Sequence, residues 1–404
     1  MKFIHFDKSL DMIDSIQLNS YKTKKLYLCD ALGYTLAQDI ISQDNSPEFP
    51  TSAMDGYAIR HQDQKLGRIK ISSINPAGSE LVDEVEEGTT IKTFTGSLMP
   101  KGSDTLIPIE NVEVDGDYIK IIDEVEFGFS VREVGENYSK NQNLIPKDTL
   151  IDIAQIGVMA SLNIVSVLVY DKPTVSIIST GSELLELGET QTNHSQIRSS
   201  NNYILEALVQ KYGGNPLQLG CIKDDIDTIT TTIKEALSQS DIVVTTGGVS
   251  VGDFDFVEDV VKALGCEVIF KGVRVKPGQH IMVAQKRHGN KTKFIISLPG
   301  FAYSSTVTAL LYLVPLISKF QNANNPIKIV NATLKEPFIK RAKKAEFTAC
   351  NLSLEDGEYI VDFKGKKVGS SAILTNMLGD IALLYTKEDE SNKFIGDSVK
   401  VVMF

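Results

Sequence analysis

The chain has 404 residues, of which 42% are hydrophobic and 23% charged, a composition typical of a folded protein with roughly two to four domains. Its net charge of −11 argues against broad nucleic-acid binding, which requires a basic surface. An anionic small-molecule ligand stays open, because exposed charges are screened beyond about 8–10 Å. The N-terminal residues do not resemble a secretion signal, and the four cysteines form no CxxC pair, so a reducing cytoplasm is expected.

The N-terminal part of the chain shows two helical signals. Leu10, Ile13 and Ile16 recur at the spacing of one helix face. Asp30 is suited to cap the start of a second, short helix. Residues 1–46 are therefore expected to be mainly helical.

Residues 47–137 have a different texture, because short β-rich runs alternate there with glycine, proline and aspartate turns. A helical pattern at 154–160 and an apolar strand at 165–170 follow. The β-rich segment is therefore expected to be a domain nested within a helical one, formed by residues 1–46 and 138–171 together.

Residues 172–321 alternate between short apolar runs and amphipathic helical patterns. Such alternation predicts a doubly wound, mostly parallel sheet with helices on both faces. The last helical run is too short to span a membrane and is expected to be buried. We expect strands at 175–178, 217–219, 241–245, 266–270, 281–284 and 294–298, and helices around 204–212, 226–237, 257–264 and 307–317.

Beyond residue 322 the helical period disappears and strand-like runs replace it. Residues 322–404 are therefore expected to form a small C-terminal β domain. Its strands are expected at 327–330, 359–363, 382–385 and 399–403.

Three specialised loops, at 179–184, 245–255 and 298–305, follow strands of the predicted sheet. Because ligands of open α/β sheets bind at the carboxyl ends of the strands, these loops are expected to meet. Glycine lets a backbone approach a phosphate closely, and the N-terminus of a following helix directs amides toward it. Each loop alone could be only a tight turn, but three at one edge favour a phosphate-bearing ligand.

Acidic side chains gather in the same loops, which favours Mg²⁺ bound between protein and substrate oxygens. Helix capping is the alternative, and Asp224 and Asp225 fit it equally well. Asp255 is harder to explain by folding alone. Lys276 is a candidate anion ligand, although an isolated lysine is usually a solvated surface group. The run 51–58 stays undecided between a functional site and a turn.

Seven distinctive segments occur along the chain, at 50–58, 94–108, 132–137, 179–184, 246–253, 275–278 and 298–300. The first reads Pro-Thr-Ser-Ala-Met-Asp-Gly-Tyr-Ala and the fifth Thr-Gly-Gly-Val-Ser-Val-Gly-Asp. In combination and in order they resemble the molybdopterin molybdenumtransferase family, which includes MoeA and the E domain of gephyrin. The resemblance covers essentially the whole chain.

The resemblance implies an α/β molybdopterin-binding domain at 172–321, a β insert at 47–137 and a C-terminal β-barrel-like domain at 322–404. It implies a cytoplasmic homodimer whose site lies between the α/β domain of one subunit and the insert of the other. The implied reaction inserts molybdenum from molybdate into adenylated molybdopterin, releases AMP and requires Mg²⁺. The implied protein partners are the molybdopterin adenylyltransferase and apo-molybdoenzymes, with no nucleic acid and no membrane.

The resemblance also implies roles for individual residues. The expected catalytic residues are Asp55, Thr95, Glu183, Asp224 and Asp255, of which Glu183 and Asp255 would also bind Mg²⁺. Gly247, Gly248 and Ser250 are expected to bind the pterin phosphate, and Lys276, Ser304 and Ser370 to bind molybdate.

Four positions depart from the family pattern. Phe301-Ala302 stands where the family has Asn-Pro, Gln279 where a second lysine is common, Asn137 where an aspartate is usual, and Ala349 where an arginine is common. Arg341 or Lys344 are candidates to replace that arginine, and His280 or Arg274 could compensate for lost charge. Because the acidic residues are all retained, drift with compensation is favoured over an altered or inactive paralogue.

Three alternative functions stay open. The chain could be a non-catalytic pterin-binding or scaffold protein, although scaffolding requires none of the retained acids. It could be a variant that prefers another oxyanion, such as tungstate. An adenylyltransferase acting one step earlier would share the α/β domain, but residues 1–171 and 322–404 would then be unexplained.

Overall fold

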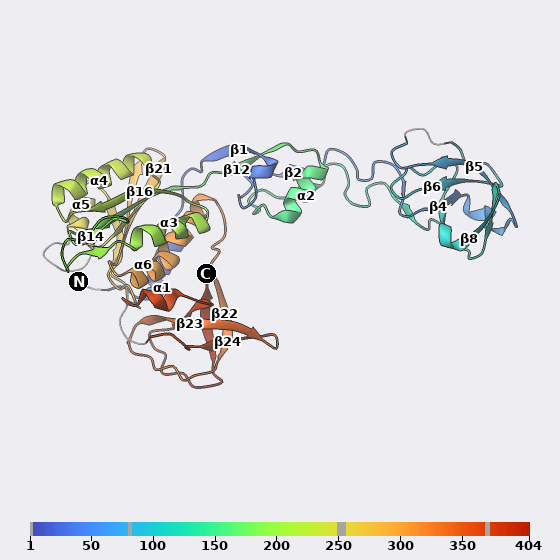
Figure 1. Ribbon diagram of the computed structural model, residues 1–404. Helices are drawn as coiled ribbons and strands as arrows, with labels where there is room; N and C mark the ends of the chain where they lie inside the picture. The colour runs from blue at the N-terminus through green and yellow to red at the C-terminus, as the bar shows by residue number, and fades with distance from the viewer. Residues whose placement is uncertain (1–2, 80–82, 249–255, 368–371) are drawn as a thin grey trace. The chain divides into compact units, whose positions relative to one another are not determined.

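The computed structural model describes residues 3–79, 83–248, 256–367 and 372–404 (Figure 1). The chain divides into two compact units. The larger consists of residues 1–37, 148–156 and 166–404, and the smaller of residues 38–147 and 157–165.

The larger unit contains a six-stranded sheet in the order β16-β13-β17-β21-β20-β18. The first four strands run parallel, and the β20–β21 hairpin turns the sheet antiparallel toward β18. This arrangement confirms the predicted mostly parallel α/β fold. The strands are β13 (Thr174–Thr180), β16 (Asn215–Ile222), β17 (Ile242–Thr246), β18 (Glu267–Lys271), β20 (Met282–His288) and β21 (Lys291–Leu298).

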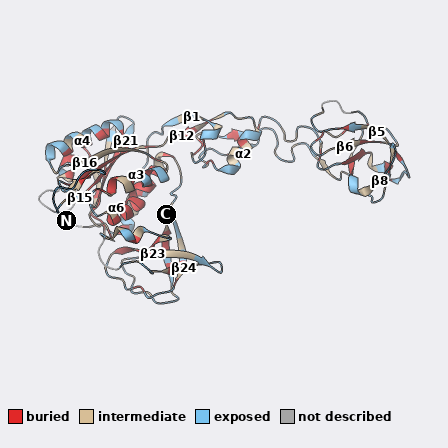
Figure 2. Ribbon diagram, viewed as in Figure 1, coloured by how far each residue is buried: buried red, intermediate tan, exposed pale blue. Residues whose placement is uncertain are grey.

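Helices cover both faces of this sheet, because its strands are apolar on both sides. Ile177 packs in the cluster on the α3 side, whereas the next residue, Ile178, packs in the cluster on the α4 and α5 side. The apolar run near the end of the domain is buried, as predicted (Figure 2). The helical elements are α3 (Asn201–Lys211), α4 (Ile226–Gln239), α5 (Val257–Ala263), α6 (Ala302–Thr308), the π-helical turn η4 (Ala309–Leu313) and α7 (Val314–Phe320).

The N-terminal segment is not mainly helical, so that expectation is wrong. α1 (Phe6–Asp14) is its one α-helix among the described residues, and β1 (Thr23–Tyr27) pairs antiparallel with β12 (Ser166–Tyr170). Asp30 lies at the end of a short 3₁₀ turn, η1 (Leu28–Asp30), and caps no helix start. Local periodicity missed β1 because its partner strand is far away in the sequence.

α1 packs onto the α/β domain. Phe6 and Ile13 are buried in the same apolar cluster as the α6–α7 segment. The Ser9 hydroxyl donates to the Phe6 carbonyl at 2.6 Å, so the buried Tyr312 hydroxyl, 2.8 Å away, donates to Ser9 Oγ. Burial also raises the pKa of Tyr312, which therefore stays a protonated donor.

The C-terminal domain is a closed barrel of five strands. The order β23-β24-β22-β26-β25 closes through the pairing of β25 with β23, and β19 (Val275–Lys276) adds to β23 in parallel. β23 was not predicted, because polar residues interrupt its apolar pattern. The barrel strands are β22 (Lys328–Leu334), β23 (Ala345–Glu355), β24 (Glu358–Asp362), β25 (Ile381–Thr386) and β26 (Ser398–Met403), with the 3₁₀ turn η5 (Leu374–Met377) before β25.

The smaller unit contains a six-stranded sheet in the order β7-β4-β6-β5-β9-β8, in agreement with the β-rich texture of residues 47–137. Two short pairs, β2–β11 and β3–β10, accompany it, and α2 (Ile153–Ser161) is divided between the two units. Its strands are β2 (Ile40–Ile41), β3 (Thr51–Ser52), β4 (Gly56–Ile59), β5 (Ile69–Asn75), β6 (Thr89–Thr93), β7 (Thr105–Pro108), β8 (Val112–Asp115), β9 (Tyr118–Ile121), β10 (Val131–Arg132) and β11 (Asn143–Ile145).

The docking of α1 can be tested through its buried hydroxyl pair. Ser9→Ala leaves the Tyr312 hydroxyl buried without its acceptor and should lower the free energy of unfolding by about 1–3 kcal/mol. Tyr312→Phe leaves Ser9 bonded to Phe6 and should cost only about 1 kcal/mol. The double variant should be more stable than Ser9→Ala alone. Urea unfolding of the three variants measures this order, and equal losses in both single variants would contradict the packing.

Candidate functional site

The three specialised loops meet at one edge of the α/β sheet. β13, β17 and β21 are parallel neighbours, so their carboxyl ends lie side by side. The Gly247 amide donates to the Leu298 carbonyl at 3.1 Å, and the Thr180 hydroxyl donates to the Thr246 carbonyl at 3.4 Å. The predicted convergence of the loops is therefore present in the described residues.

The start of the central loop can be formed only by glycine. Gly247 and Gly248 have φ of +87° and +65°, a region that side chains disfavour. A Cβ on Gly247 would lie 2.7 Å from the Thr180 carbonyl oxygen, and one on Gly248 would lie 2.8 Å from a Val257 methyl group. The backbone amides of this turn therefore stay close to the strand ends. Ser250 and Asp255 lie outside the described residues.

Two of the predicted acidic residues come from adjacent loops of this edge. The Ser182 amide donates to Asp224 Oδ2 at 3.2 Å, which brings the β13 loop and the β16 loop together. Glu183 is exposed, and its carboxylate folds back over Gly181, where a Cβ would lie 2.8 Å from Oε1. Asp225 instead caps α4, accepting from the Thr228 amide at 2.8 Å. The two aspartates thus take different roles, one at the site and one in the scaffold.

Glu186 supports this edge, and sequence reasoning did not single it out. Its carboxylate accepts from the Cys221 amide at 2.7 Å and from the Tyr203 hydroxyl at 3.1 Å. Burial is the main cause that raises the pKa of Cys221 to about 11, and the Glu186 carboxylate also raises it. This thiol therefore stays protonated and inert. The position of Glu186, three residues after Glu183, was the one signal in the sequence that it belongs to this edge. Only the fold shows which residues it contacts.

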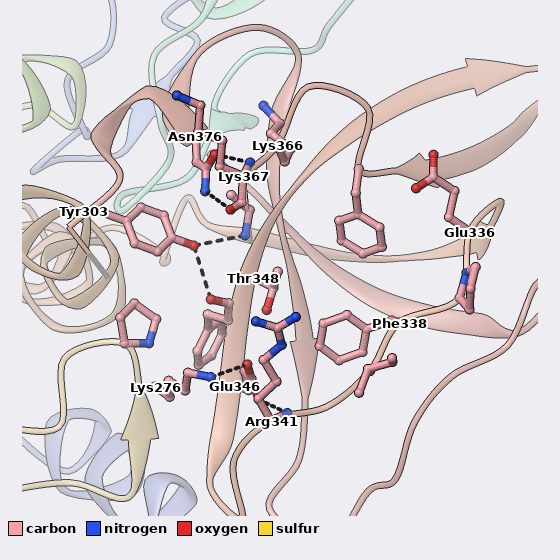
Figure 3. A pocket seen from close by; sticks show the side chains of 16 residues that line it. Lys276, Tyr303, Glu336, Phe338, Arg341, Glu346, Thr348, Lys366, Lys367 and Asn376 are labelled. Carbon is pink, nitrogen blue, oxygen red and sulfur yellow. Dashed lines mark hydrogen bonds and ion pairs between the residues drawn. The ribbon is translucent and has the colours of Figure 1, made fainter. Parts of the chain in front are cut away.

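A separate cavity of about 290 Å³ lies between the α/β domain and the barrel, and we call it the cation cavity (Figure 3). α6 contributes Tyr303, β19 and the residue after it contribute Lys276 and Pro277, and the remaining lining residues come from the C-terminal domain. Phe338 and Phe363 form its apolar side, with ring centroids 5.9 Å apart. Its charged lining residues are Lys276, Glu336, Arg341, Glu346, Lys366 and Lys367.

One buried carboxylate organises the cation cavity. Glu346 is 4% exposed, and its Oε1 lies 3.0 Å from Lys276 Nζ. Its Oε2 accepts from the amides of Arg341 and Ala342 at 3.1 and 3.2 Å. The parallel register places Lys276 directly opposite Glu346 on β23. Neither Glu346 nor the long strand that carries it was predicted.

The two remaining predicted oxyanion residues are not placed in the cavity. Ser304 is buried in the first turn of α6, and the described cavity lining does not include it. Its carbonyl accepts from the Thr308 hydroxyl at 2.8 Å. Ser370 lies outside the described residues. Lys276 is therefore the one predicted oxyanion ligand that the described residues place in this cavity.

In the smaller unit, Asp55 and Thr95 form a pair. Asp55 Oδ1 accepts from both the amide and the hydroxyl of Thr95, each at 2.8 Å. The Thr95 amide, and next its hydroxyl, hold the pKa of Asp55 below its usual range. Gly56 follows because a Cβ there would clash with the Ile107 carbonyl oxygen. The segment 51–58 therefore has two features: Gly56 packs tightly against a neighbouring strand, and Asp55 is kept ionised by Thr95.

The structure accounts for two of the four departures from the family pattern. The Ala349 amide donates to the Tyr303 hydroxyl at 2.9 Å, and Ala349, Tyr303 and Phe347 share one apolar cluster. Gln279 accepts from the Lys344 ammonium and contacts the His280 ring at 2.9 Å. Ala349 and Gln279 therefore each make specific contacts in this chain.

The other two departures lie at exposed positions. The Asn137 amide group reaches Ser46 Oγ at 3.4 Å. Phe301 is 60% exposed and precedes α6 without capping it through its side chain. Nothing in the structure explains the aromatic ring at 301.

Two models of known protein families match separate regions of the chain. A model of the MoeA N-terminal region (domains I and II) matches residues 4–163, and a model of a probable molybdopterin binding domain matches residues 176–319. A molybdopterin molybdenumtransferase of Nostoc sp. is 32% identical over 303 residues, which cover 74% of this chain and 69% of that protein. The one from Bacillus subtilis is 30% identical over 361 residues, covering 87% and 83%.

Solved structures show the same architecture. The molybdopterin biosynthesis MoeA protein from Pyrococcus horikoshii aligns over the whole of both chains with a TM-score of 0.83 and 28% identity. None of the helices among the described residues has the length and apolarity needed to cross a membrane. The fold, the family models and the relatives therefore agree, and the chain belongs to the molybdopterin molybdenumtransferase family of molybdenum cofactor biosynthesis.

Proposed function

We propose that this chain inserts molybdenum from molybdate into adenylated molybdopterin, with release of AMP. In this reaction an oxygen of water or molybdate attacks the phosphoanhydride and AMP leaves, and the two dithiolene sulfurs replace an oxide ligand of molybdenum, which leaves as water with the two thiol protons. One observation supports the pairing of substrates best. The loop 298–303 touches the glycine turn, where a Cβ on Gly300 would lie 3.8 Å from Gly247 Cα, and three residues later Tyr303 lines the cation cavity.

The sheet edge suits the phosphate end of adenylated molybdopterin. The Gly247 amide is bonded to the Leu298 carbonyl, but the glycine turn at 247–248 leaves no side chain between a phosphate and the backbone around it. Each amide hydrogen bond to a charged phosphate contributes about 1.5–3 kcal/mol, so a few such donors outweigh the global negative charge of the chain. The turn would thereby fix the diphosphate beside the acidic loops.

We propose Mg²⁺ as the metal of this edge. Carboxylate oxygens are the ligands it prefers, and it commonly takes one or two of them together with substrate phosphate oxygens. Glu183 and, from the sequence, Asp255 are the proposed ligands, and the Ser182 contact brings Asp224 to the loop that carries Glu183. When bound, Mg²⁺ would neutralise charge on the diphosphate and on the leaving AMP.

The cation cavity suits the tetrahedral oxyanion. Lys276 provides an ammonium at its α/β side, oriented by Glu346, and the barrel provides further cations. Charge-assisted hydrogen bonds of this kind are roughly twice as strong as neutral ones. We further propose that a second copy of the chain completes the site through its Asp55 and Thr95.

The pH dependence of AMP release tests the role of Asp55. Its pKa is depressed by Thr95, so the ionised form persists to lower pH than in a free aspartate. Thr95→Val removes the hydroxyl donor, should raise the pKa of Asp55 toward its usual value, and should shift the acid limb of the profile to higher pH. Thr95→Ser keeps the donor and should leave the limb in place. An unmoved acid limb in Thr95→Val would count against Asp55 as the titrating group, and Asp55→Asn should lower the rate about 100-fold.

The shared site can be tested by mixing variants. Asp55→Asn and Glu183→Gln subunits, co-expressed with two affinity tags, should give hybrid dimers in which one of two sites is intact. An equal mixture should therefore regain about a quarter of the wild-type sites. Asp55→Asn mixed with Thr95→Ala should regain nothing, because both changes fall on the same contribution. Absence of regained AMP release in isolated hybrid dimers would contradict the shared site.

A further inference from the structure

The cation cavity holds a guanidinium whose charge is not compensated within it. Lys276 is paired with the buried Glu346, and the Lys366 ammonium donates to the Leu378 carbonyl at 2.6 Å. The Arg341 guanidinium, in contrast, has no carboxylate within ion-pair distance among the described residues. Figure 3 shows it turned into the cavity beside Thr348. An unpaired cation facing a cavity requires an anionic partner or water.

The backbone beneath this guanidinium is fixed by the same carboxylate that holds Lys276. The amides of Arg341 and of the next residue both donate to Glu346 Oε2, while Lys276 lies at Oε1. Because Glu346 is buried, loss of its partners would leave an uncompensated buried charge, which is strongly destabilising. Lys276 and Arg341 are therefore held around one carboxylate, from the two domains that form the cavity.

Two nearby cations outside the lining of the cavity face elsewhere. The Lys344 ammonium donates to Gln279 and lies 5.8 Å from the Phe3 ring centroid. Arg274 is bound to Glu388 at 2.8 Å and to the Lys343 carbonyl at 3.1 Å. Neither residue belongs to the described lining of the cavity. Of the cations considered as replacements, Arg341 is the one that reaches it.

Position 349 lines the cavity but supplies no charge, because its residue is alanine. Alternate residues of a strand point to opposite faces, so Glu346 and Thr348 share one face of β23 and Phe347 and Ala349 the other, and the cavity touches both pairs. Ala349 is 3% exposed in the apolar cluster that contains Tyr303, whose hydroxyl accepts from its amide. A cation reaches the cavity instead from the turn that precedes the strand.

We propose that Arg341 is the guanidinium ligand of the tetrahedral oxyanion, completing with Lys276 a two-cation pocket for a dianion such as molybdate. This proposal rests on the proposed function, because it takes the oxyanion as the substrate that fills the cavity. The planar guanidinium presents two parallel donors, which match two oxygens of a tetrahedral anion better than a single ammonium does.

The test compares Arg341→Ala, Arg341→Lys and Lys344→Ala with the wild-type chain. Equilibrium dialysis with radiolabelled molybdate measures oxyanion binding directly, and AMP release as a function of molybdate concentration measures its use. Arg341→Ala should weaken molybdate binding about 10- to 100-fold, the equivalent of one charge-assisted contact. The molybdate affinity of Arg341→Lys should lie between those of the wild type and Arg341→Ala, since the lysine keeps the charge and loses the paired donors. Lys344→Ala, the matched control from the same turn, should bind as the wild type does.

A second readout separates this assignment from a folding defect. Arg341→Ala should bind adenylated molybdopterin as tightly as the wild type and should recover AMP release at high molybdate. Molybdate binding within twofold of the wild type in Arg341→Ala would overturn the assignment, and so would an equal loss in Lys344→Ala. If the wild type binds molybdate through Arg341 but releases no AMP, the assignment stands and the proposed function fails. If it releases AMP with an unchanged molybdate dependence in Arg341→Ala, the reverse holds.

Discussion

The parallel pairing of β13, β17 and β21 is the constraint on which the site depends. Each strand is buried on both faces, so the only places where these segments can present polar groups are their ends. Parallel direction brings the three carboxyl ends to one edge, and the glycine turn at 247–248 keeps the loops close enough to bond to one another. The convergence of the three loops is therefore a consequence of the sheet's direction.

The buried Glu346 carboxylate plays the corresponding role at the cation cavity. A charge buried in this way is tolerated only when hydrogen bonds and an opposite charge satisfy it. Here one oxygen pairs with Lys276 and the other accepts two amides, so every contact also fixes a part of the wall. The β19–β23 pairing sets this register, and it connects the α/β domain to the barrel. The surface proposed to bind an anion is thus built around an anion of the protein itself.

The departures from the family pattern also fit together in space. The Ala349 amide donates to the Tyr303 hydroxyl at the barrel wall. The Lys344 ammonium donates to Gln279, outside the cavity lining. Loss of an arginine at one position and of a lysine at another therefore does not empty the cavity of positive charge, because Arg341 and Lys276 remain. This arrangement agrees with drift accompanied by compensation within one pocket.

The sequence alone determined the α/β fold and the convergence of its three loops, because apolar strand runs, helical periods and glycine loops are local signals. It also indicated the family, because the seven segments are distinctive in combination. The tertiary structure alone decided that residues 23–27 form a strand with β12, that β23 closes the barrel and that Glu346 joins Lys276 to Arg341. Each of these depends on pairing between segments far apart in the chain, which no local pattern encodes. The choice between Arg341 and Lys344 also depended on the tertiary structure. Gln279 binds the Lys344 ammonium and Tyr303 binds the Ala349 amide, and both contacts join elements far apart in the sequence.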